Sequence, residues 1–392
     1  MGKPVSTPMA GAAIASTLMR FFAEAVDKVS GHVYESDQHS LVLQRRVPRG
    51  VIGAVTPWNF PTMNALRKLA PVLAAGNAIV LKPSEWAPRS ALHLAGLAIE
   101  AGIPAGVFNI VMGSGATVGR AIATHMDVDM LTFTGSTAAG MAMMQYSGQS
   151  NLKEVMAECG GKSPQMVFAD GVDLDDAARS IAGALVTNQG QICSVGSRLI
   201  IERSIEAEFV ERLKAEVAKI RVGDPLDPAT TFGPLVSERQ RDRVMSHIEG
   251  APGEGAQLVT GGRRLLPETN GFYVEPTIFR AVDPASRLAQ EEVFGPVLAV
   301  FAFDSEDEAI AIANGTAYGL AAYAWTSELS RAMRIANGIN SSVRINSVAP
   351  IGEAAGHAGS SEPAGQSGIG IESGLAGMES YMRRQGITIT HG

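Results

Sequence analysis

The second of the chain's two cysteines lies in a polar segment, Asn188–Ser194 (NQGQICS). An isolated cysteine is more often a small buried hydrophobic residue than a reactive one. The amide side chains and the glycine around Cys193 instead favour a loop at the N-terminus of a helix, where the dipole and nearby groups can activate a thiol. These residues alone leave Cys193 as either a core residue or a nucleophile.

Two further polar residues follow apolar runs, and each has a structural and a catalytic interpretation. Glu158 precedes Cys159, two glycines and Lys162. Because burial disfavours a charged carboxylate, Glu158 either pairs with a cation such as Lys162 or acts as a general base in a half-apolar pocket. Asn59, in TPWNFP, is either an ordinary turn residue or a carboxamide donor to an oxyanion.

Two glycine-rich segments fall between a predicted strand and a predicted helix, where helix N-termini can bind phosphate. Gly113–Gly119 (GSGATVG) is one residue longer than the GxGxxG fingerprint, and Gly135–Gly140 (GSTAAG) lacks the lysine of a P-loop, so each is a weak signal by itself. The segment Lys82–Glu85 (KPSE) ends another predicted strand. A glutamate there can hydrogen-bond ribose hydroxyls and would repel a 2′-phosphate, which favours NAD over NADP.

The segments from Gly50 to Gly160 alternate short apolar runs with helical patterns. Runs that are apolar throughout predict strands buried on both faces, and their alternation with helices predicts the βαβ units of a parallel sheet, which binds ligands at the C-terminal ends of its strands. Strands are predicted at 50–56, 78–82, 107–111, 130–134 and 155–158, and helices at 61–75, 88–101, 117–125 and 137–146.

A second α/β domain is predicted after Gly161, where the alternation starts again. Helices are predicted at 174–187, 206–220 and 307–313, and strands at 198–202, 297–301 and 321–326. The stretch 349–370 is rich in glycine, serine, alanine and proline, which is typical of a loop.

Composition excludes several classes of protein. The 392 residues suit two or three domains, and 46% hydrophobic residues predict a large core. The net charge, 32 minus 39 or −7, is unfavourable for binding nucleic acid or anionic membranes. Seven scattered histidines predict no metal site, and two cysteines suit a reducing cytosol, so we expect a cytoplasmic protein. No apolar stretch of the length of a membrane span and no signal peptide are evident.

Ten segments match one enzyme family in chain order: TPWNFP, LAAGNAIVLKPSE, FTGST, ECGGKSP, NQGQICS, GPLVS, EPTIF, EEVFGP, YGLAA and SGIG-x-E. Through them the sequence resembles the NAD(P)-dependent aldehyde dehydrogenase superfamily from about Gly2 to Tyr381. One such segment would be weak, but ten in order make the resemblance specific.

The resemblance implies that Cys193 is the nucleophile, Glu158 the general base and Asn59 the side-chain donor of the oxyanion hole. Lys68 and Glu372 would line a proton-relay path behind the base. The Cys193 thiolate would attack an aldehyde, hydride would pass to NAD and leave a thioester, and water activated by Glu158 would release the acid. No metal is required for this reaction.

The resemblance also implies the binding residues. Arg67 would pair with a substrate carboxylate, which favours an acid semialdehyde, although a surface or interhelical arginine is an equally common role. The implied cofactor-binding residues, for NAD rather than NADP, are Thr56, Pro57, Trp58, Lys82, Ser84, Glu85, Gly115, Gly119, Phe133, Gly135, Ser136, Glu292 and Phe294.

The predicted architecture is α/β, with a Rossmann-like parallel-sheet cofactor domain, an α/β catalytic domain and a small β oligomerisation element. The element would pair a hairpin near 30–47 with a C-terminal strand at 386–391, and would build a homodimer or homotetramer. The domains are predicted at 1–29 with 49–160 (NAD binding), 161–380 (catalytic), and 30–48 with 381–392 (oligomerisation).

The sequence departs from the family in two places. Roughly a hundred residues of the family's N-terminal part have no counterpart before the GKP segment. The family's PFGG-x-K segment is replaced by Glu362–Gln366 (EPAGQ). Two alternatives therefore stand beside the dehydrogenase: a catalytically silent homologue with a structural role, and a thiol hydrolase that uses Cys193 and Glu158 without redox chemistry.

Overall fold

The computed structural model describes residues 1–348 and 360–390, without the side chains of residues 6–12. The chain divides into two compact units. One unit, called here unit 11–158, combines 11–158 with 351–362 and 369–392, and the other, unit 159–350, combines 159–350 with 1–10 and 363–368.

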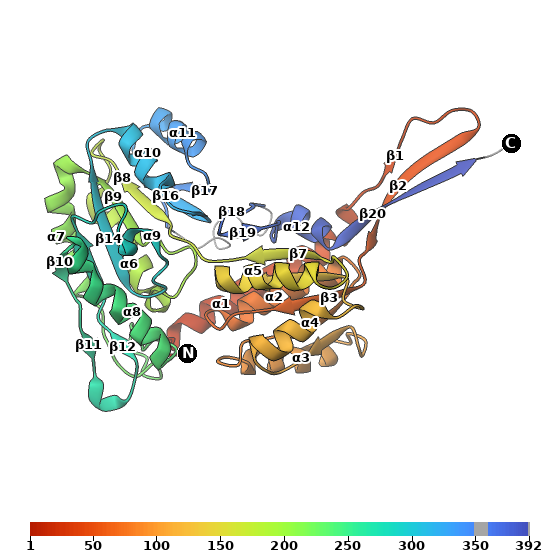
Figure 1. Cartoon of the computed structure of the whole chain (residues 1–392), viewed down its shortest axis with the longest axis horizontal. Helices are drawn as coiled ribbons and strands as arrows, with labels where there is room; N and C mark the ends of the chain where they lie inside the picture. Colours follow the sequence, from red (N-terminus) through yellow and green to blue (C-terminus); the bar gives the residue numbers. More distant parts are fainter. Residues whose placement is uncertain (349–359, 391–392) are drawn as a thin grey trace. The chain divides into compact units, whose positions relative to one another are not determined.

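Unit 11–158 is built on a parallel sheet with the strand order β7-β6-β3-β4-β5 and the short β19 beside β7. Figure 1 labels its strands β3, β7 and β19. The chain enters the sheet at its centre, adds β4 and β5 on one side and then β6 and β7 on the other. The strands are β3 Val51–Val55, β4 Ala78–Lys82, β5 Phe108–Ile110, β6 Met130–Thr134, β7 Glu154–Glu158 and β19 Gly368–Ile369. This order creates a switch point between β3 and β6, where parallel sheets bind ligands.

Helices connect these strands because each crossover must return the chain to the start of a parallel strand. The connecting helices are α2 Pro61–Ala74, α3 Arg89–Glu100, α4 Arg120–Thr124 and α5 Thr137–Gly148. The unit also contains α12 Gly374–Ser380 and residues 11–25 of α1 Ser6–Ala25. Gly76 and Gly102 follow α2 and α3 with φ of +82° and +84°, a conformation that favours glycine at a helix end. Side chains of α1, α2 and α12 pack with Ile52, Ile79 and Leu81 in one core.

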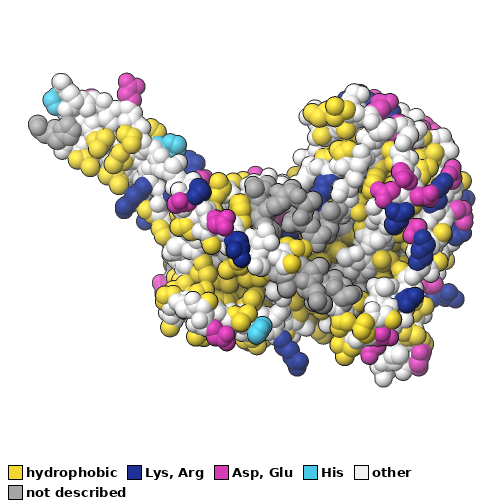
Figure 2. Space-filling view, turned by 180° about the vertical axis from the view of Figure 1, so that it is seen from behind, with side chains coloured by type: hydrophobic (Ala, Val, Ile, Leu, Met, Phe, Trp, Pro, Cys, Tyr) yellow, Lys and Arg dark blue, Asp and Glu magenta, His cyan; other side chains and the backbone are white. Residues whose placement is uncertain are grey.

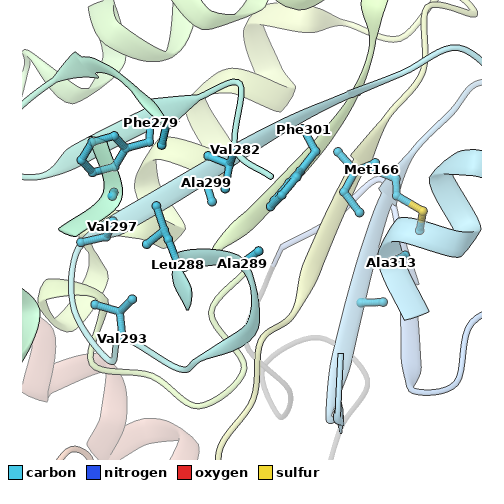
Figure 3. Close-up of a cluster of buried hydrophobic side chains, with 14 of the residues drawn as sticks. Met166, Phe279, Val282, Leu288, Ala289, Val293, Val297, Ala299, Phe301 and Ala313 are labelled. Atoms are coloured by element: carbon cyan, nitrogen blue, oxygen red, sulfur yellow. The ribbon is translucent and has the colours of Figure 1, made fainter. Parts of the chain in front are cut away.

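Unit 159–350 contains a sheet with the strand order β10-β13-β14-β9-β8-β16-β17, parallel except for β10. Alternate residues of a strand point to opposite faces. Leu199 and Ile201 of β9 accordingly pack with α6 and α7, whereas Ile200 packs in the cluster with α8 to α11 that Figure 3 shows around Leu288 and Phe301.

The strands of this sheet are β8 Pro164–Val167, β9 Arg198–Glu202, β10 Gln257–Thr260, β13 Thr277–Arg280, β14 Val297–Phe303, β16 Ala321–Trp325 and β17 Ser342–Ile345. Its helices are α6 Leu174–Val186, α7 Glu206–Val217, α8 Glu238–Gly250, α9 Arg287–Gln290, α10 Glu306–Asn314 and α11 Leu329–Gly338. Two short antiparallel pairs complete the unit: β11 Arg264–Leu265 with β12 Tyr273–Val274, and β15 Tyr318–Gly319 with β18 Ala364–Gly365.

A three-stranded antiparallel sheet extends from unit 11–158. It consists of β1 His32–Val33, β2 Ser40–Pro48 and β20 Met382–Thr390, with β2 in the centre. The register runs from Ser40 opposite Thr390 to Pro48 opposite Met382, so the expected pairing of the hairpin with the C-terminal strand is observed. Hydrophobic side chains lie exposed on this sheet (Figure 2), and Val33 is 74% exposed.

Two local expectations differ from the structure. The helix expected at 117–125 begins instead as a π-helical turn, Gly115–Gly119, capped by Ser114, before α4. Residues 349–359 of the expected loop lie outside the described part of the chain, and the rest of it contains the short strands β18 and β19. Among the described residues, no helix is long and apolar enough to cross a membrane, and no cluster of acidic, histidine and cysteine side chains could hold a metal ion.

Candidate active site

The predicted cofactor residues of unit 11–158 lie at the carboxyl ends of neighbouring strands. Thr56, Pro57 and Trp58 follow β3, Lys82 ends β4 and is followed by Ser84 and Glu85, and Gly135 and Ser136 follow β6. The structure therefore gathers them at one edge of the sheet, beside the switch point. Phe133, on β6, is buried, and Gly115 and Gly119 bound the π-helical turn before α4.

This edge presents groups suited to a dinucleotide. The Lys82 ammonium is buried and donates to the Pro83 carbonyl at 2.9 Å and to Glu85 at 3.3 Å, while the Glu85 side chain is half exposed. Ser84 is buried. Ser136 caps the N-terminus of α5 and accepts from the Ala139 N–H, and the end of such a helix attracts anionic phosphate.

Asn59 is a buried carboxamide two residues before α2, and its side-chain oxygen accepts two hydrogen bonds. Its Oδ1 accepts from the Phe60 N–H at 3.1 Å and from Asn64 Nδ2 at 3.3 Å. These two bonds establish which end of the amide is the oxygen, so the other end, Nδ2, is the one that can donate. This arrangement fits the expected role as an oxyanion donor.

Lys68, one turn of α2 after Asn64, lies in a buried polar cluster. Its ammonium is 2.6 Å from Glu372 Oε1 and 2.9 Å from Thr132 Oγ1, and the Tyr381 hydroxyl donates to the same Thr132 oxygen at 3.1 Å. Lys68 is completely buried. The structure thus brings together the two residues that the resemblance placed on a proton-relay path.

Glu158 ends β7 and is half-buried beside this cluster. Burial raises its pKa to about 8, the Glu372 carboxylate adds to the rise, and Lys68 and Arg67 oppose it. A carboxyl group with such a pKa can both hold and accept a proton near neutral pH, as a general base must. Arg67 itself is half-buried on α2 and close enough to act electrostatically on Glu158.

Cys193 is half-buried in a turn of unit 159–350 between a short 3-10 segment, Thr187–Gly190, and β9. The expectation that it lies at a helix N-terminus is therefore wrong. The physical reason is that Asn188, Gln189 and Gly190 adopt left-handed φ angles of 49°, 57° and 68°, which turn the chain so that it continues as a strand. The Cys193 thiol therefore does not lie at the N-terminus of a helix, and a helix dipole does not act on it there.

The EEVFGP segment lies against the same turn. A Cβ on Gly190 would lie 2.3 Å from the Gly295 carbonyl oxygen, so the two segments touch through backbone atoms. Glu292 accepts from the Gly161 N–H at 3.0 Å, and burial raises the pKa of its carboxyl group. Phe294 has a left-handed φ of +57°.

Gly160 and Gly161 are needed for space rather than for an unusual φ. A Cβ on Gly161 would lie 2.4 Å from the Cys193 carbonyl oxygen, and one on Gly160 would lie 2.5 Å from Glu292 Oε2. Neither glycine has a positive φ. The CGGKSP residues 159–164, the nucleophile turn and the EEVFGP segment therefore pack together within unit 159–350.

The sequence did not predict the residues that brace these segments. Gln240 of α8 donates to the Phe294 carbonyl at 2.8 Å, and Arg243 donates to the Glu292 carbonyl at 2.6 Å. Gln191 accepts from the Val236 N–H at 3.1 Å and fixes the turn from its N-terminal side. Their partners are backbone atoms far along the chain, which leave no signal in a motif.

The predicted residues thus form two groups, one in each unit. Unit 159–350 holds the Cys193 thiol and the EEVFGP segment. Unit 11–158 holds Glu158, the Lys68–Glu372 pair, Asn59 and the strand ends predicted to bind the dinucleotide. The chain matches the aldehyde dehydrogenase family over residues 1–387. It belongs to that family.

Named relatives agree with this assignment. The NADP/NAD-dependent aldehyde dehydrogenase PuuC of Escherichia coli (strain K12) is 47% identical over 321 residues, which are 82% of this chain and 64% of PuuC. An indole-3-acetaldehyde dehydrogenase, AldA of P. syringae, solved in complex with NAD+ and IAA, is 45% identical with a TM-score of 0.96, and the match covers 100% of this chain and 78% of that one.

A γ-glutamyl-γ-aminobutyraldehyde dehydrogenase from Burkholderia cenocepacia J2315 is 46% identical with a TM-score of 0.95, over 99% of this chain and 78% of that one. The predictions of an α/β fold, of the family, of a dehydrogenase acting on aldehydes and of NAD as cofactor are confirmed at the level of this family. The roles of individual residues remain predictions.

Proposed function

We propose that this chain oxidises an aldehyde to the carboxylic acid through a thioester on Cys193, with Glu158 as the base that releases the product. One observation carries the proposal: Glu158, at the end of β7, has a pKa of about 8 and is backed by the buried Lys68–Glu372 pair. Thioester hydrolysis needs a base of this kind near neutral pH.

The residues divide the reaction between them. Cys193 attacks the carbonyl carbon as a thiolate, and Asn59 donates to the oxyanion that forms. Hydride from the resulting adduct would pass to bound NAD, which would leave the thioester on Cys193. Glu158 then takes a proton from water as the water attacks the thioester carbon, and the Cys193 sulfur leaves. The Lys68–Glu372 pair can pass the proton on from Glu158.

The residues present fit a dinucleotide. Lys82 and Glu85 would hold the adenosine ribose, Ser136 at the N-terminus of α5 would bind the pyrophosphate, and Glu292 and Phe294 would bind the nicotinamide ribose and ring. The half-exposed Glu85 carboxylate would repel a 2′-phosphate, so we expect NAD to be used better than NADP.

For the substrate we propose an aldehyde that carries a carboxylate. Arg67 is a half-buried cation whose charge acts on Glu158, so it is near the group that performs hydrolysis. A γ-glutamyl-γ-aminobutyraldehyde dehydrogenase is among the similar structures. Arginine is well suited to binding a carboxylate through two hydrogen bonds.

We also propose a homodimer or homotetramer that forms along β20, in a compartment that keeps Cys193 reduced, such as the cytosol. β20 is an edge strand of its sheet, and its outer edge can pair with a second copy. Exposed apolar residues on the sheet, including Leu41 and Ile389, support such an interface.

The test is NADH formation by the purified chain across a panel of aliphatic, aromatic and acidic aldehydes. Wild type should be active and prefer the acidic aldehydes, Cys193→Ala should be inactive, and Arg67→Gln should raise KM for acidic aldehydes alone. Ester cleavage without NADH formation on any aldehyde would contradict the proposal. A lack of both activities, with no NAD binding, would identify a silent homologue.

A further inference from the structure

The turn that follows Cys193 is held from below by two buried side chains. Tyr323 of β16 donates its hydroxyl to the Ser194 carbonyl at 2.8 Å, and Gln165 of β8 donates its amide Nε2 to the Gly196 carbonyl at 2.7 Å. Tyr323 is 3% exposed and Gln165 is 0% exposed. The two bonds engage carbonyls one and three residues beyond the nucleophile.

The sheet sets the positions of these two donors. Tyr323 and Gln165 are register partners on adjacent parallel strands, so their side chains stand side by side on one face. β8 pairs on its other side with β9, the strand that the turn enters (Figure 1). The donors therefore belong to the rigid part of unit 159–350, whereas the nucleophile is on a connection.

Gly196 shows how closely the turn lies on this support. A Cβ at that position would lie 2.2 Å from Cγ of Gln165, so any other residue would displace the turn or the glutamine. Burial raises the pKa of Tyr323, the hydrogen bond to Ser194 opposes the rise, and Cys193 adds to it. The hydroxyl therefore keeps its proton and remains a donor, and it lies near enough to Cys193 to sense its charge.

We infer that Tyr323, together with Gln165, is a positioning residue for Cys193. It fixes the C-terminal side of the nucleophile turn, as Gln191 fixes the N-terminal side through the Val236 N–H. The inference rests on the proposed function of Cys193 as nucleophile. Positioning of an attacking atom contributes to rate because a small displacement from the line of attack is costly.

The experiment compares Tyr323→Phe with Tyr273→Phe. Both tyrosines are buried and donate to a backbone carbonyl, but the Tyr273 hydroxyl of β12 donates to the Gly223 carbonyl at 2.9 Å, which is not part of the nucleophile turn. Gln165→Met, which keeps the length of the side chain and removes the donor, is the second variant. The readouts are kcat and KM for NAD, and alkylation of the two cysteines by iodoacetamide in the protein without cofactor.

Tyr323→Phe should lower kcat about tenfold with little change in KM for NAD. It should also speed the alkylation of half-buried Cys193 at a pH where the thiol is ionised, while buried Cys159 stays unlabelled and so reports that the fold is intact. Gln165→Met should act in the same directions, and Tyr273→Phe should leave both readouts unchanged.

Equal kinetics and equal alkylation in Tyr323→Phe and Tyr273→Phe would overturn the inference. So would faster labelling of Cys159 together with Cys193 in Tyr323→Phe, because that pattern indicates general loosening. The alkylation comparison needs no turnover. If wild type oxidises no aldehyde, the proposed function fails, and the labelling rates still decide whether Tyr323 positions the thiol.

Discussion

Glu158 is the residue whose environment most directly sets the chemistry. Its carboxyl group is held neutral by burial and by the Glu372 charge, while Lys68 and Arg67 favour the ionised form. Because a base works only when deprotonated, hydrolysis of the thioester should accelerate as pH rises through about 8. The same shift makes the folded state hold a proton that the unfolded chain releases, so Glu158 reduces stability as pH rises from its ordinary range toward 8.

Replacing Lys68 by methionine tests this balance. The variant lacks a cation that lowers the pKa of Glu158 and keeps the Glu372 charge that raises it, so the midpoint of the pH–rate profile for acyl-enzyme hydrolysis should move above that of wild type. Breaking a buried pair should also cost roughly 3–5 kcal/mol of unfolding free energy. The double variant Lys68→Met/Glu372→Gln should recover part of that loss, and a midpoint that moves to lower pH would contradict the account.

Gly161 lies where there is no room for a side chain. A Cβ there would lie 2.4 Å from the Cys193 carbonyl oxygen, a backbone atom that cannot rotate away. Gly161→Ala should therefore displace the nucleophile turn and lower kcat at least about a hundredfold. Gly183→Ala is the matched control, because Gly183 lies inside α6 with open space around its Cβ position, and alanine there should stabilise the helix by about 1 kcal/mol. Unchanged turnover in Gly161→Ala would refute this explanation.

At the scale of elements, α8 holds the segment that should bind the nicotinamide. Gln240 donates to the carbonyls of Val293 and Phe294, and Phe294 is kept in a left-handed conformation. Gln240→Met should release these carbonyls and let Phe294 relax, which should raise KM for NAD several-fold. The affinity is measured by titration with NAD. An unchanged affinity would show that the EEVFGP segment keeps its conformation without Gln240. Arg239→Met, on the same helix, is the control.

The elements were predicted better than the connections between them. The strands predicted at 78–82 and 130–134 agree with the structure. A short, fully apolar run bounded by a glycine or a polar cluster is stable mainly as a strand that is buried on both faces of a sheet. The helix N-terminus expected at Cys193 was predicted wrongly, because Asn188, Gln189 and Gly190 adopt left-handed φ angles in succession, a run that polar and glycine residues do not by themselves predict.

Braces between side chain and backbone were invisible in the sequence. Tyr323 and Ser194 are 129 residues apart, and the acceptor is a backbone carbonyl, which every residue type has. Cys193, Glu158 and Asn59 were accessible because their flanking residues form family motifs. The Lys68–Glu372 contact followed from the same resemblance and not from spacing.

At the scale of the whole molecule, the account predicts that copies associate along the β1-β2-β20 sheet. Leu41 and Ile389 are register partners on β2 and β20 and are both exposed, which is unfavourable in water. The double variant Leu41→Lys/Ile389→Lys should dissociate the oligomer in light scattering, and its helix and strand content should persist.

Leu258→Lys provides the matched control, because Leu258 is also exposed on an edge strand, β10, in the other unit. It should leave the mass unchanged. A wild-type chain that is monomeric at all concentrations, or a double variant that stays assembled, would contradict the proposed interface.

The central claim is that Cys193 carries a thioester which Glu158 hydrolyses. It is tested most directly by mixing Glu158→Gln rapidly with NAD and an aldehyde that wild type oxidises, and by following NADH and the intact protein mass. The account predicts a burst of one equivalent of NADH, an acyl group that accumulates on Cys193, and little further turnover. Steady turnover without a burst, or an acyl group on Cys159, would contradict it.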